Sequence, residues 1–548
     1  MRTLEGCGFV ERLWAGDAGL WSASPEGQAL VKNRLGWLTA PGFMRAKLGE
    51  VTEFADEVRR SGYTHVVLLG MGGASLAAEV FARTFGHRQG FPDLLVLDST
   101  DPAAVKQVLE RISIPRTLFV VASKSGTTLE PLAFYRFFRA RVEQAVPKAG
   151  SQFIAITDPG TPLEQLAKAE HFRRVFLNPP TIGGRYSAIS YFGCVPAALI
   201  GVDLNRILEA TEAMVSRCGA GVPARENPGV ILGAALGALA KAGRDKVTLI
   251  VLPRLRALGA WVEQLLAEST GKNGRGLVPV DGELLGGPAA YGDDRFFVAV
   301  PLEGETGLEG RLAELRAAKH PVLSITLKDS FDLGAEFFRW EVATATAAVL
   351  LEVNPFDEPH VQAAKDNTAT LLEAHRSGRQ PADWPPALTE HGIGLVTHDG
   401  VRPPSLGDGL AAHLALAKPG DYLALLAYLP PGDDVAAGLQ TLRTLLRDRF
   451  KLATTVGYGP RYLHSTGQLH KGGPDTGLFI QITSDDPDDL AVPGEPYSFG
   501  VLKRAQALGD LQALRSRGRR VIRLHLDKKP AEALGRLNKL VAKALQAS

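Results

Sequence analysis

The clearest chemistry in this 548-residue sequence lies in one turn that follows a run of apolar, β-type residues. The turn reads Ser123-Lys124-Ser125-Gly126-Thr127-Thr128, and a helical stretch begins directly after it. Its four hydroxyls, its amine and the free N–H groups of a helix start favour binding of phosphate or sulfate. The alternative is a Ser/Thr-rich helix cap, which would use one or two hydroxyls. We therefore predict a site for a compact phosphate monoester.

A second turn, Gly70-Met71-Gly72-Gly73-Ala74-Ser75, joins another apolar run to a helical stretch. Glycines let the backbone approach a ligand, so Gly72, Gly73 and Ser75 are further candidates for binding the phosphate. A dinucleotide site is the alternative, because Gly70-x-Gly72 begins the fingerprint and Asp98 ends the next strand. Ser75 replaces the third glycine of that fingerprint, and such a turn can also serve tight packing alone.

Two charged side chains lie where their surroundings could make them reactive. Glu268 is placed in the last turn of an amphipathic helix that ends at Gly271. The negative end of the helix dipole and partial burial both raise a carboxylate pKa, which suits a base. Arg185 follows Gly183-Gly184, whose backbone can press a guanidinium into a pocket. By position alone, each could also be an ordinary surface residue.

Lys365 and His464 are two further candidates. We expect a helix that starts near Pro359 with Asp357 as its N-cap, which would place Glu358, Gln362 and Lys365 on one face. His464 lies in a turn after an apolar run, in Tyr462-Leu-His464-Ser-Thr-Gly-Gln. An exposed helix lysine and a structural histidine are the alternatives.

The elements that would position these residues fall into four regions: an arm at 1–50, then 51–215, 216–380 and 381–548. The arm contains three tryptophans, Trp14, Trp21 and Trp37, and is expected to wrap onto a larger body. Short apolar runs that alternate with helical stretches predict α/β units with doubly wound parallel sheets. The runs are 65–70, 94–98, 117–123, 153–157, 246–253, 295–302, 322–327, 422–430, 452–459, 477–483 and 520–526. A Pro-rich linker is expected at 380–392.

The composition excludes several classes of protein. With 61 basic and 59 acidic residues, the chain has no net field for nucleic acid or an anionic membrane surface. It has no basic leader, and no run reaches the roughly 18 apolar residues of a membrane span. Three scattered cysteines, Cys7, Cys194 and Cys218, predict neither a disulfide framework nor a zinc site. We expect a cytoplasmic protein without metal or cofactor.

The two turns together resemble the sugar isomerase fold, and further segments narrow the resemblance to the glucose-6-phosphate isomerase family. These segments are Gly183-Gly-Arg-Tyr-Ser187, Glu268-Ser-Thr-Gly-Lys272 and His464-Ser-Thr-Gly-Gln468. The match is fullest to the isomerase portion of fused transaldolase/glucose-6-phosphate isomerase proteins, from Asn33 onward, with no transaldolase portion expected ahead of it.

The resemblance implies a role for each candidate. Glu268 would move a proton between C1 and C2 of the sugar through a cis-enediol, and Arg185 would stabilise the enediolate. Lys365 and His464 would open the sugar ring. The resemblance also implies a homodimer, in which His464 could come from the second chain, and no cofactor.

The chain departs from the family pattern in three places. Ala74 replaces the family's serine, with Ser75 one place later. Glu358 stands where the family usually has glutamine, and an anion near phosphate costs affinity unless it is protonated, turned away or paired, although Gln362 could substitute. His464 also follows Lys365, which reverses the usual order, so either the region 381–548 brings the histidine back to the same pocket or another group opens the ring.

The sequence thus predicts a glucose-6-phosphate isomerase that interconverts glucose 6-phosphate and fructose 6-phosphate. Two alternatives stay open at this point: an isomerase that also accepts mannose 6-phosphate, and a non-catalytic phosphosugar sensor. A dehydrogenase that uses the Gly70 turn is a third.

Overall fold

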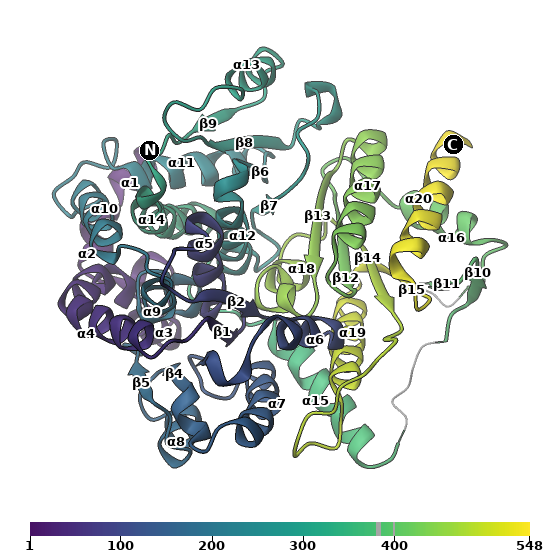
Figure 1. The fold of residues 1–548 in the computed structure, drawn as a ribbon. Helices are drawn as coiled ribbons and strands as arrows, with labels where there is room; N and C mark the ends of the chain where they lie inside the picture. Colours follow the sequence, from purple (N-terminus) through teal and green to yellow (C-terminus); the bar gives the residue numbers. More distant parts are fainter. Residues whose placement is uncertain (380–384, 398–400, 548) are drawn as a thin grey trace.

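The computed structural model describes residues 1–379, 385–397 and 401–547 of the chain (Figure 1). Its first sheet is parallel, with strand order β2-β1-β3-β4-β5. The strands are β1 (His65–Gly70), β2 (Asp93–Leu97), β3 (Thr117–Ala122), β4 (Phe153–Thr157) and β5 (Arg174–Leu177). All five fall inside the predicted region 51–215.

The second sheet is also parallel, in the order β7-β6-β8-β9, and lies within 216–380. Its strands are β6 (Lys246–Val251), β7 (Val278–Val280), β8 (Arg295–Val300) and β9 (Val322–Ser324). The third sheet has the order β10-β11-β15-β14-β12-β13. Its strands are β10 (Leu388–Glu390), β11 (Ile393–Val396), β12 (Tyr422–Tyr428), β13 (Ala453–Tyr458), β14 (Gly477–Ser484) and β15 (Arg520–Leu526). β10 and β11 form an antiparallel edge on four parallel strands.

Helices cover both faces of the sheets. Those of the first half are α1 (Arg2–Gly6), α2 (Phe9–Trp14), α3 (Pro25–Lys32), α4 (Ala40–Arg60), α5 (Leu76–Phe85), α6 (Pro102–Arg111), α7 (Leu129–Ala145), α8 (Pro162–Ala169), α9 (Tyr191–Leu199), α10 (Leu204–Arg217), α11 (Pro228–Lys241) and α12 (Arg256–Thr270). Those of the second half are α13 (Glu309–Ala317), α14 (Leu333–Leu351), α15 (Gln362–Arg376), α16 (Leu406–Leu414), α17 (Asp433–Phe450), α18 (Gly467–Gly472), α19 (Phe499–Ser516) and α20 (Pro530–Ala547).

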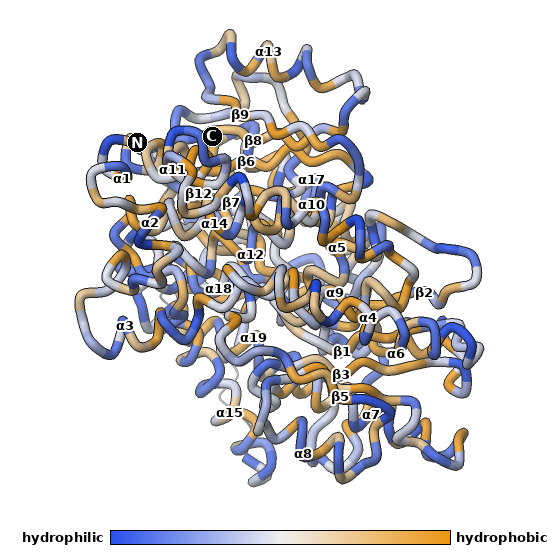
Figure 2. Tube along the Cα trace, turned by 90° about the vertical axis from the view of Figure 1, so that its left-hand side faces the viewer, coloured by the Kyte–Doolittle hydropathy of each residue, from blue (hydrophilic) through white to orange (hydrophobic). Residues whose placement is uncertain are grey.

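The apolar runs become strands because both faces of each sheet are covered. In β1, Val66 and Leu68 point into the core cluster that contains α4, α5 and α9, whereas Val67 and Leu69 point into the cluster with α6 and α7. Side chains alternate between the two faces of a strand, so a strand that is covered on both sides must be apolar throughout. Figure 2 shows apolar residues along β1 and β3 and hydrophilic residues at the outer turns.

All the predicted apolar runs contain strands, and the predicted fold class is confirmed. The short strands β5, β7, β10 and β11 were not anticipated, because three or four residues carry little periodic signal. The expected helix start near Pro359 is wrong, since α15 begins at Gln362. Part of the predicted linker, 380–384, lies outside the described residues, and β10 occupies 388–390 of it.

The N-terminal arm packs onto the body of the protein through its tryptophans. The indole N–H of Trp14 donates to Cys218 O at 2.7 Å, and that of Trp21 donates to Ala345 O at 2.9 Å. The ring of Trp37 packs against Tyr186 at 5.5 Å between centroids. Residue 50, the expected end of the arm, lies inside α4. The boundary between the arm and the next region stays a prediction.

The third sheet packs against both of the other units (Figure 1). Phe499 of α19 contacts the aromatic rings of Phe134 and Phe137 on α7. Leu469 of α18 belongs to a core cluster with Ala267 of α12. This double contact places the turn between β13 and α18 where the first two units meet. Within the part of the chain that the structure describes, we find no helix with the length and apolar character needed to cross a bilayer.

We predict that Trp21→Ala destabilises the protein. Trp21 is 9% exposed and packs edge-on against Phe356 at 5.1 Å. The substitution removes this contact and the Ala345 hydrogen bond, at a cost of about 3–5 kcal/mol. Thermal unfolding followed by circular dichroism should show a melting temperature several degrees lower. Leu30→Ala, at an exposed position on the same arm, is the control. Equal melting temperatures for Trp21→Ala and the wild type would contradict the assigned packing.

Candidate active site

A pocket of about 510 Å³ lies at the carboxyl ends of β1 and β3. The last turn of α12, the start of α15 and the short helices η6 (Gly184–Tyr186) and η10 (Arg461–His464) close its sides. It brings together most of the predicted site residues from all three units. These are Gly72, Gly73, Ser123, Lys124, Ser125, Thr128, Arg185, Glu268, Lys365 and His464.

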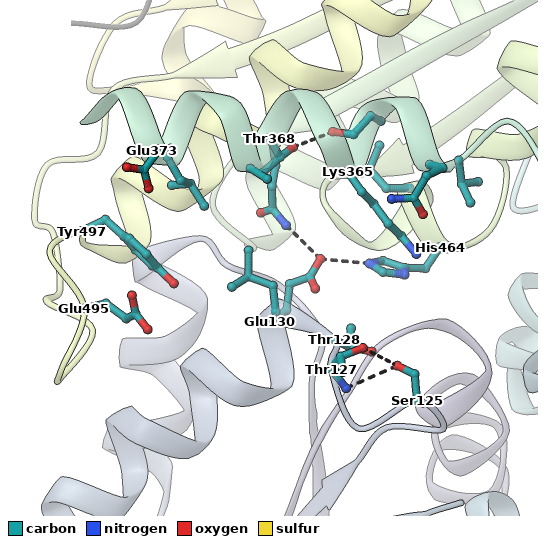
Figure 3. A pocket seen from close by; sticks show the side chains of 18 of the residues that line it. Ser125, Thr127, Thr128, Glu130, Lys365, Thr368, Glu373, His464, Glu495 and Tyr497 are labelled. Carbon is teal, nitrogen blue, oxygen red and sulfur yellow. Dashed lines mark hydrogen bonds and ion pairs between the residues drawn. The ribbon is translucent and has the colours of Figure 1, made fainter. Parts of the chain in front are cut away.

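Two predicted phosphate ligands lie elsewhere. Thr127 lines an adjoining pocket of about 590 Å³, which shares Ser125, Thr128, Lys365 and His464 with the first (Figure 3). Ser75 is fully buried, and its hydroxyl donates to Gly72 O at 3.2 Å and to Asp98 at 3.4 Å. Because Ala74 lines the pocket and Ser75 turns inward, the shift by one residue removes a hydroxyl from this wall.

The hydroxyls of the Ser123–Thr128 turn bond to one another. Ser123 pairs with Thr128 at 2.9 Å, and Ser125 pairs with Thr127 at 2.9 Å. Thr128 occupies the N-cap of α7, yet among the described residues its side chain makes no capping hydrogen bond. The simple capping alternative therefore does not account for these hydroxyls, which remain available to an oxyanion at the helix start.

Lys124 is bound to the pocket wall. Its ammonium pairs with Asp158 and donates to Pro180 O at 2.9 Å. Burial lowers the pKa of Lys124, while the Asp158 carboxylate opposes this shift. An incoming phosphate therefore meets a lysine whose charge a carboxylate already balances.

Gly72 and Gly73 of the second turn lie where a larger side chain would overlap neighbouring atoms. Gly72 has φ +55°, and a Cβ there would meet Gln264 and His464 at 2.8–3.0 Å. A Cβ at Gly73 would lie 2.0 Å from Gly184 O. The two glycines thus let the turn pack between the Arg185 loop and the His464 turn, in addition to leaving its backbone open to a ligand.

Glu268 lies on the last turn of α12 with its side chain 13% exposed. Burial raises its pKa, and Arg185 opposes this rise. The Gln264 amide, one helical turn earlier, donates to Glu268 Oε2 at 3.2 Å and to His464 O at 2.7 Å. Sequence reasoning missed Gln264, although its i−4 spacing from Glu268 was a signal. The amide links the candidate base to the turn that carries His464.

Arg185 is buried, with its side chain 5% exposed, and every guanidinium nitrogen has a partner. Nε donates to Ser269 at 2.9 Å. Nη2 donates to the carbonyl oxygens of Pro355 and Asp357 at 2.7 and 2.9 Å. Nη1 lies 2.9 Å from Glu358 and 3.4 Å from Glu268. Nη1 is therefore the guanidinium nitrogen that contacts both carboxylates, Glu358 and Glu268.

The predicted N-cap role of Asp357 is wrong. Asp357 instead pairs with buried Lys272 at 2.7 Å, and Lys272 also donates to Asn354 O at 2.6 Å. The 354–358 segment turns its carbonyls toward Lys272 and Arg185, so it cannot be helical. Glu358 therefore precedes α15 and does not share a helix face with Lys365. Gln362 points to Asp366 at 2.7 Å and is exposed, so Glu358, paired with Arg185, fills the pocket position itself.

Lys365, on α15, and His464, in η10, both line this pocket and the adjoining one, and Figure 3 draws the two side chains pointing into the same part of it. The His464 ring lies 2.9 Å from Glu130, which also accepts a hydrogen bond from Gln506 at 2.8 Å. Burial alone would raise the pKa of Glu130, but His464 holds it below its usual value. His464 reaches this pocket from the same chain. His470, by contrast, is buried between aromatic rings.

The doubly wound α/β framework, with a hydroxyl-rich turn at a helix start and a largely buried carboxylate beside a buried arginine, is that of the phosphosugar isomerases with the sugar isomerase fold. Residues 48–293 match the family model for phosphoglucose isomerase. The chain belongs to the phosphoglucose isomerase family, as the sequence predicts.

Relatives and solved structures agree with this assignment. Glucose-6-phosphate isomerase of Symbiobacterium thermophilum is 30% identical over 390 residues, which cover 62% of this chain and 86% of that protein. The Prochlorococcus marinus (strain NATL2A) enzyme is 31% identical over 369 residues, covering 60% and 69%. A hypothetical protein from Thermus thermophilus superposes with a TM-score of 0.58 at 25% identity, over 68% of this chain and 96% of that one. A Chlamydia trachomatis glucose-6-phosphate isomerase, at 21% identity, shares the fold with a TM-score of 0.52 over 68% and 78%.

We predict that Gly73→Ala reduces isomerase activity at least ~10-fold, because the new Cβ displaces the Arg185 loop by overlapping Gly184 O. Steady-state kinetics with fructose 6-phosphate measure the effect. Gly42→Ala on α4, where a Cβ meets no atom of the described chain within 4 Å, should keep full activity. Wild-type kinetics in Gly73→Ala would show that the close approach is unimportant for the site.

Proposed function

We propose that this protein interconverts glucose 6-phosphate and fructose 6-phosphate with Glu268 as base and Arg185 as the cation beside the enediolate. Membership of the phosphoglucose isomerase family makes it an aldose–ketose isomerase. The observation that carries the residue assignment is the pocket itself. Glu268, Arg185, His464 and Lys365 all line it, together with residues of the Ser123–Thr128 turn.

Binding begins at the Ser123–Thr128 turn. The phosphate accepts hydrogen bonds from its hydroxyls and from free N–H groups at the start of α7, where the helix dipole favours an anion. Gly72 and Gly73 let the neighbouring turn approach the ligand. Anchoring the phosphate limits where C1 and C2 of the sugar can lie relative to Glu268. The binding energy of the phosphate is thereby used to orient the reacting carbons.

Ring opening needs a proton removed from the C1 hydroxyl and one delivered to the ring oxygen. His464 and Lys365 are the acid–base pair for this exchange, because both reach the pocket near the turn. The Glu130 carboxylate accepts a hydrogen bond from Nε2 of the His464 ring, which fixes the orientation and tautomer of the imidazole. The second ring nitrogen is then left to exchange a proton with the sugar.

Isomerisation follows on the open chain. Glu268 removes the proton from C2 of the aldose, the C–H electron pair forms the C1–C2 double bond, and the C1=O π pair moves to O1, which takes up a proton to give the cis-enediol. The C2 hydroxyl then gives up its proton, a C2=O bond forms, and the electron pair of the C1–C2 double bond takes the proton back from the Glu268 carboxylic acid at C1, which gives the ketose. Arg185 lies beside Glu268 and lowers the energy of the negative oxygen that develops. Burial raises the pKa of Glu268, which makes it a stronger base at neutral pH.

Assembly as a homodimer and a cytoplasmic location stay predictions, from the resemblance and the cysteine content respectively. The structure brings His464 to the pocket of its own chain, so this assignment of the reaction requires no residue from a second chain.

We predict that Glu268→Gln lowers kcat for fructose 6-phosphate ~10³-fold or more, because the amide cannot accept the C2 proton. Exchange of solvent deuterium into the product should fall in parallel. Glu263→Gln is a matched control on the same helix. Burial raises the pKa of Glu263 to about 8, so this side chain is mostly uncharged at pH 7 and glutamine imitates it. An unchanged rate in Glu268→Gln would reject the assigned base, and an inactive wild type would reject the function.

We predict that Glu130→Gln lowers kcat about 10- to 100-fold while the protein stays folded. The amide cannot replace the carboxylate that orients His464 and would present a donor to its ring. His464→Asn measures the full contribution of the imidazole. The double variant should be no slower than His464→Asn, because both changes act on one group. Fully additive losses would place Glu130 outside the His464 function.

A further inference from the structure

Two carboxylates share one nitrogen of Arg185, and the proposed reaction uses only one of them. Nη1 lies 2.9 Å from Glu358 Oε2, within the range of a hydrogen bond. It lies 3.4 Å from Glu268 Oε1, beyond that range. The guanidinium is therefore held by Glu358, and Glu268 keeps the longer, weaker contact.

The other guanidinium nitrogens prevent Arg185 from turning freely. Nε is bonded to Ser269, and Nη2 to two backbone carbonyls of the 354–358 segment. Nη1 is therefore the guanidinium nitrogen that faces both carboxylates, and Glu358 and Glu268 compete for its N–H groups.

Glu358 has the charge environment of an ionised carboxylate. Burial would raise its pKa, but the Arg185 charge holds it below the usual value. The charged groups that face Glu358 are Arg185, Lys272, Arg34, Lys124 and Glu268. Those that face Glu268 are Arg185, Glu358, His464 and Lys272. Arg185 lowers the pKa of Glu268, and Glu358 raises it.

We propose that Glu358 is a positioning residue that engages Arg185 and so prevents the guanidinium from locking Glu268 into a tight ion pair. This inference rests on the proposed function, since it assigns Glu268 as the base. A base that is held by a short hydrogen bond to arginine must break that bond before it accepts a proton. Glu358 satisfies Arg185 in its place and leaves the Glu268 carboxylate free to reach the sugar carbon.

The same pairing explains how an acidic residue is tolerated in a phosphate-binding pocket. The negative charge of Glu358 is balanced by Arg185 at 2.9 Å and by the nearby Arg34 and Lys272. Its side chain is 41% exposed, so solvent screens what remains. Glutamine has nearly the same shape as glutamate, so Glu358→Gln removes the charge with little change in volume.

The pH dependence of kcat tests the proposal. In Glu358→Gln, Arg185 can close on Glu268 and lower its pKa, so the acid limb should move to lower pH by ~0.5–1 unit. The plateau kcat should fall ~2- to 10-fold, since the base is weaker. The pH dependence of kcat reports ionisations in the enzyme–substrate complex. That of kcat/KM also reports the second ionisation of the free substrate phosphate, at about pH 6. Glu358→Asp, which keeps the charge, should restore most of the wild-type limb.

Glu352→Gln is the matched control. It removes the same charge from an exposed pair with Arg275, six residues earlier in the chain and outside the pocket. An unshifted limb in Glu358→Gln, or an equal shift in Glu352→Gln, would overturn the proposal while leaving the function intact. If the wild type were inactive, the function would fail instead. The Glu268 carboxyl would then be titrated by ¹³C NMR, and a pKa that does not fall in Glu358→Gln would also overturn the proposal.

Discussion

The site depends on one constraint: the buried guanidinium of Arg185 must have a partner for every N–H group. A buried, unpaired charge costs several kcal/mol, so the segments around it fold to supply acceptors. Ser269 comes from the end of α12, two carbonyls come from the 354–358 segment, and Glu358 completes the set. Satisfying Arg185 thereby fixes the end of α12, which carries Glu268, and the approach to α15, which carries Lys365.

The buried ammonium of Lys272 also holds the 354–358 segment in place. It bonds to Asp357 and Asn354 O, so two cations hold one short segment from two sides. Desolvation lowers the pKa of Lys272 to about 8, even with Asp357 beside it. Lys272 therefore has a structural role, because it joins the 354–358 segment to the end of α12, which carries Glu268.

The third unit contributes differently, by supplying a side chain to a pocket that the first two units build. Its helices make the contacts: α19 packs on α7 through Phe499, and α18 packs on α12 through Leu469. The turn between these contacts presents His464 to Glu130 and its backbone carbonyl to Gln264. Because Gln264 also contacts Glu268, a single amide joins the end of α12 to the turn that carries His464. The region after residue 380 thus contributes a side chain to the candidate site that the first two units build.

The sequence by itself determined the class of fold, the positions of the long strands, the turns at their carboxyl ends and the family. Continuous apolar runs and glycine- or hydroxyl-rich turns are local signals, readable without knowing what they pack against. Only the tertiary structure decided that Ser75 turns inward, that Asp357 binds Lys272 instead of capping α15, that Glu358 pairs with Arg185 and that His464 returns to this pocket. Each of these outcomes depends on a partner far away in the chain, because buried charges choose their partners by proximity in space and leave no periodic pattern in the sequence.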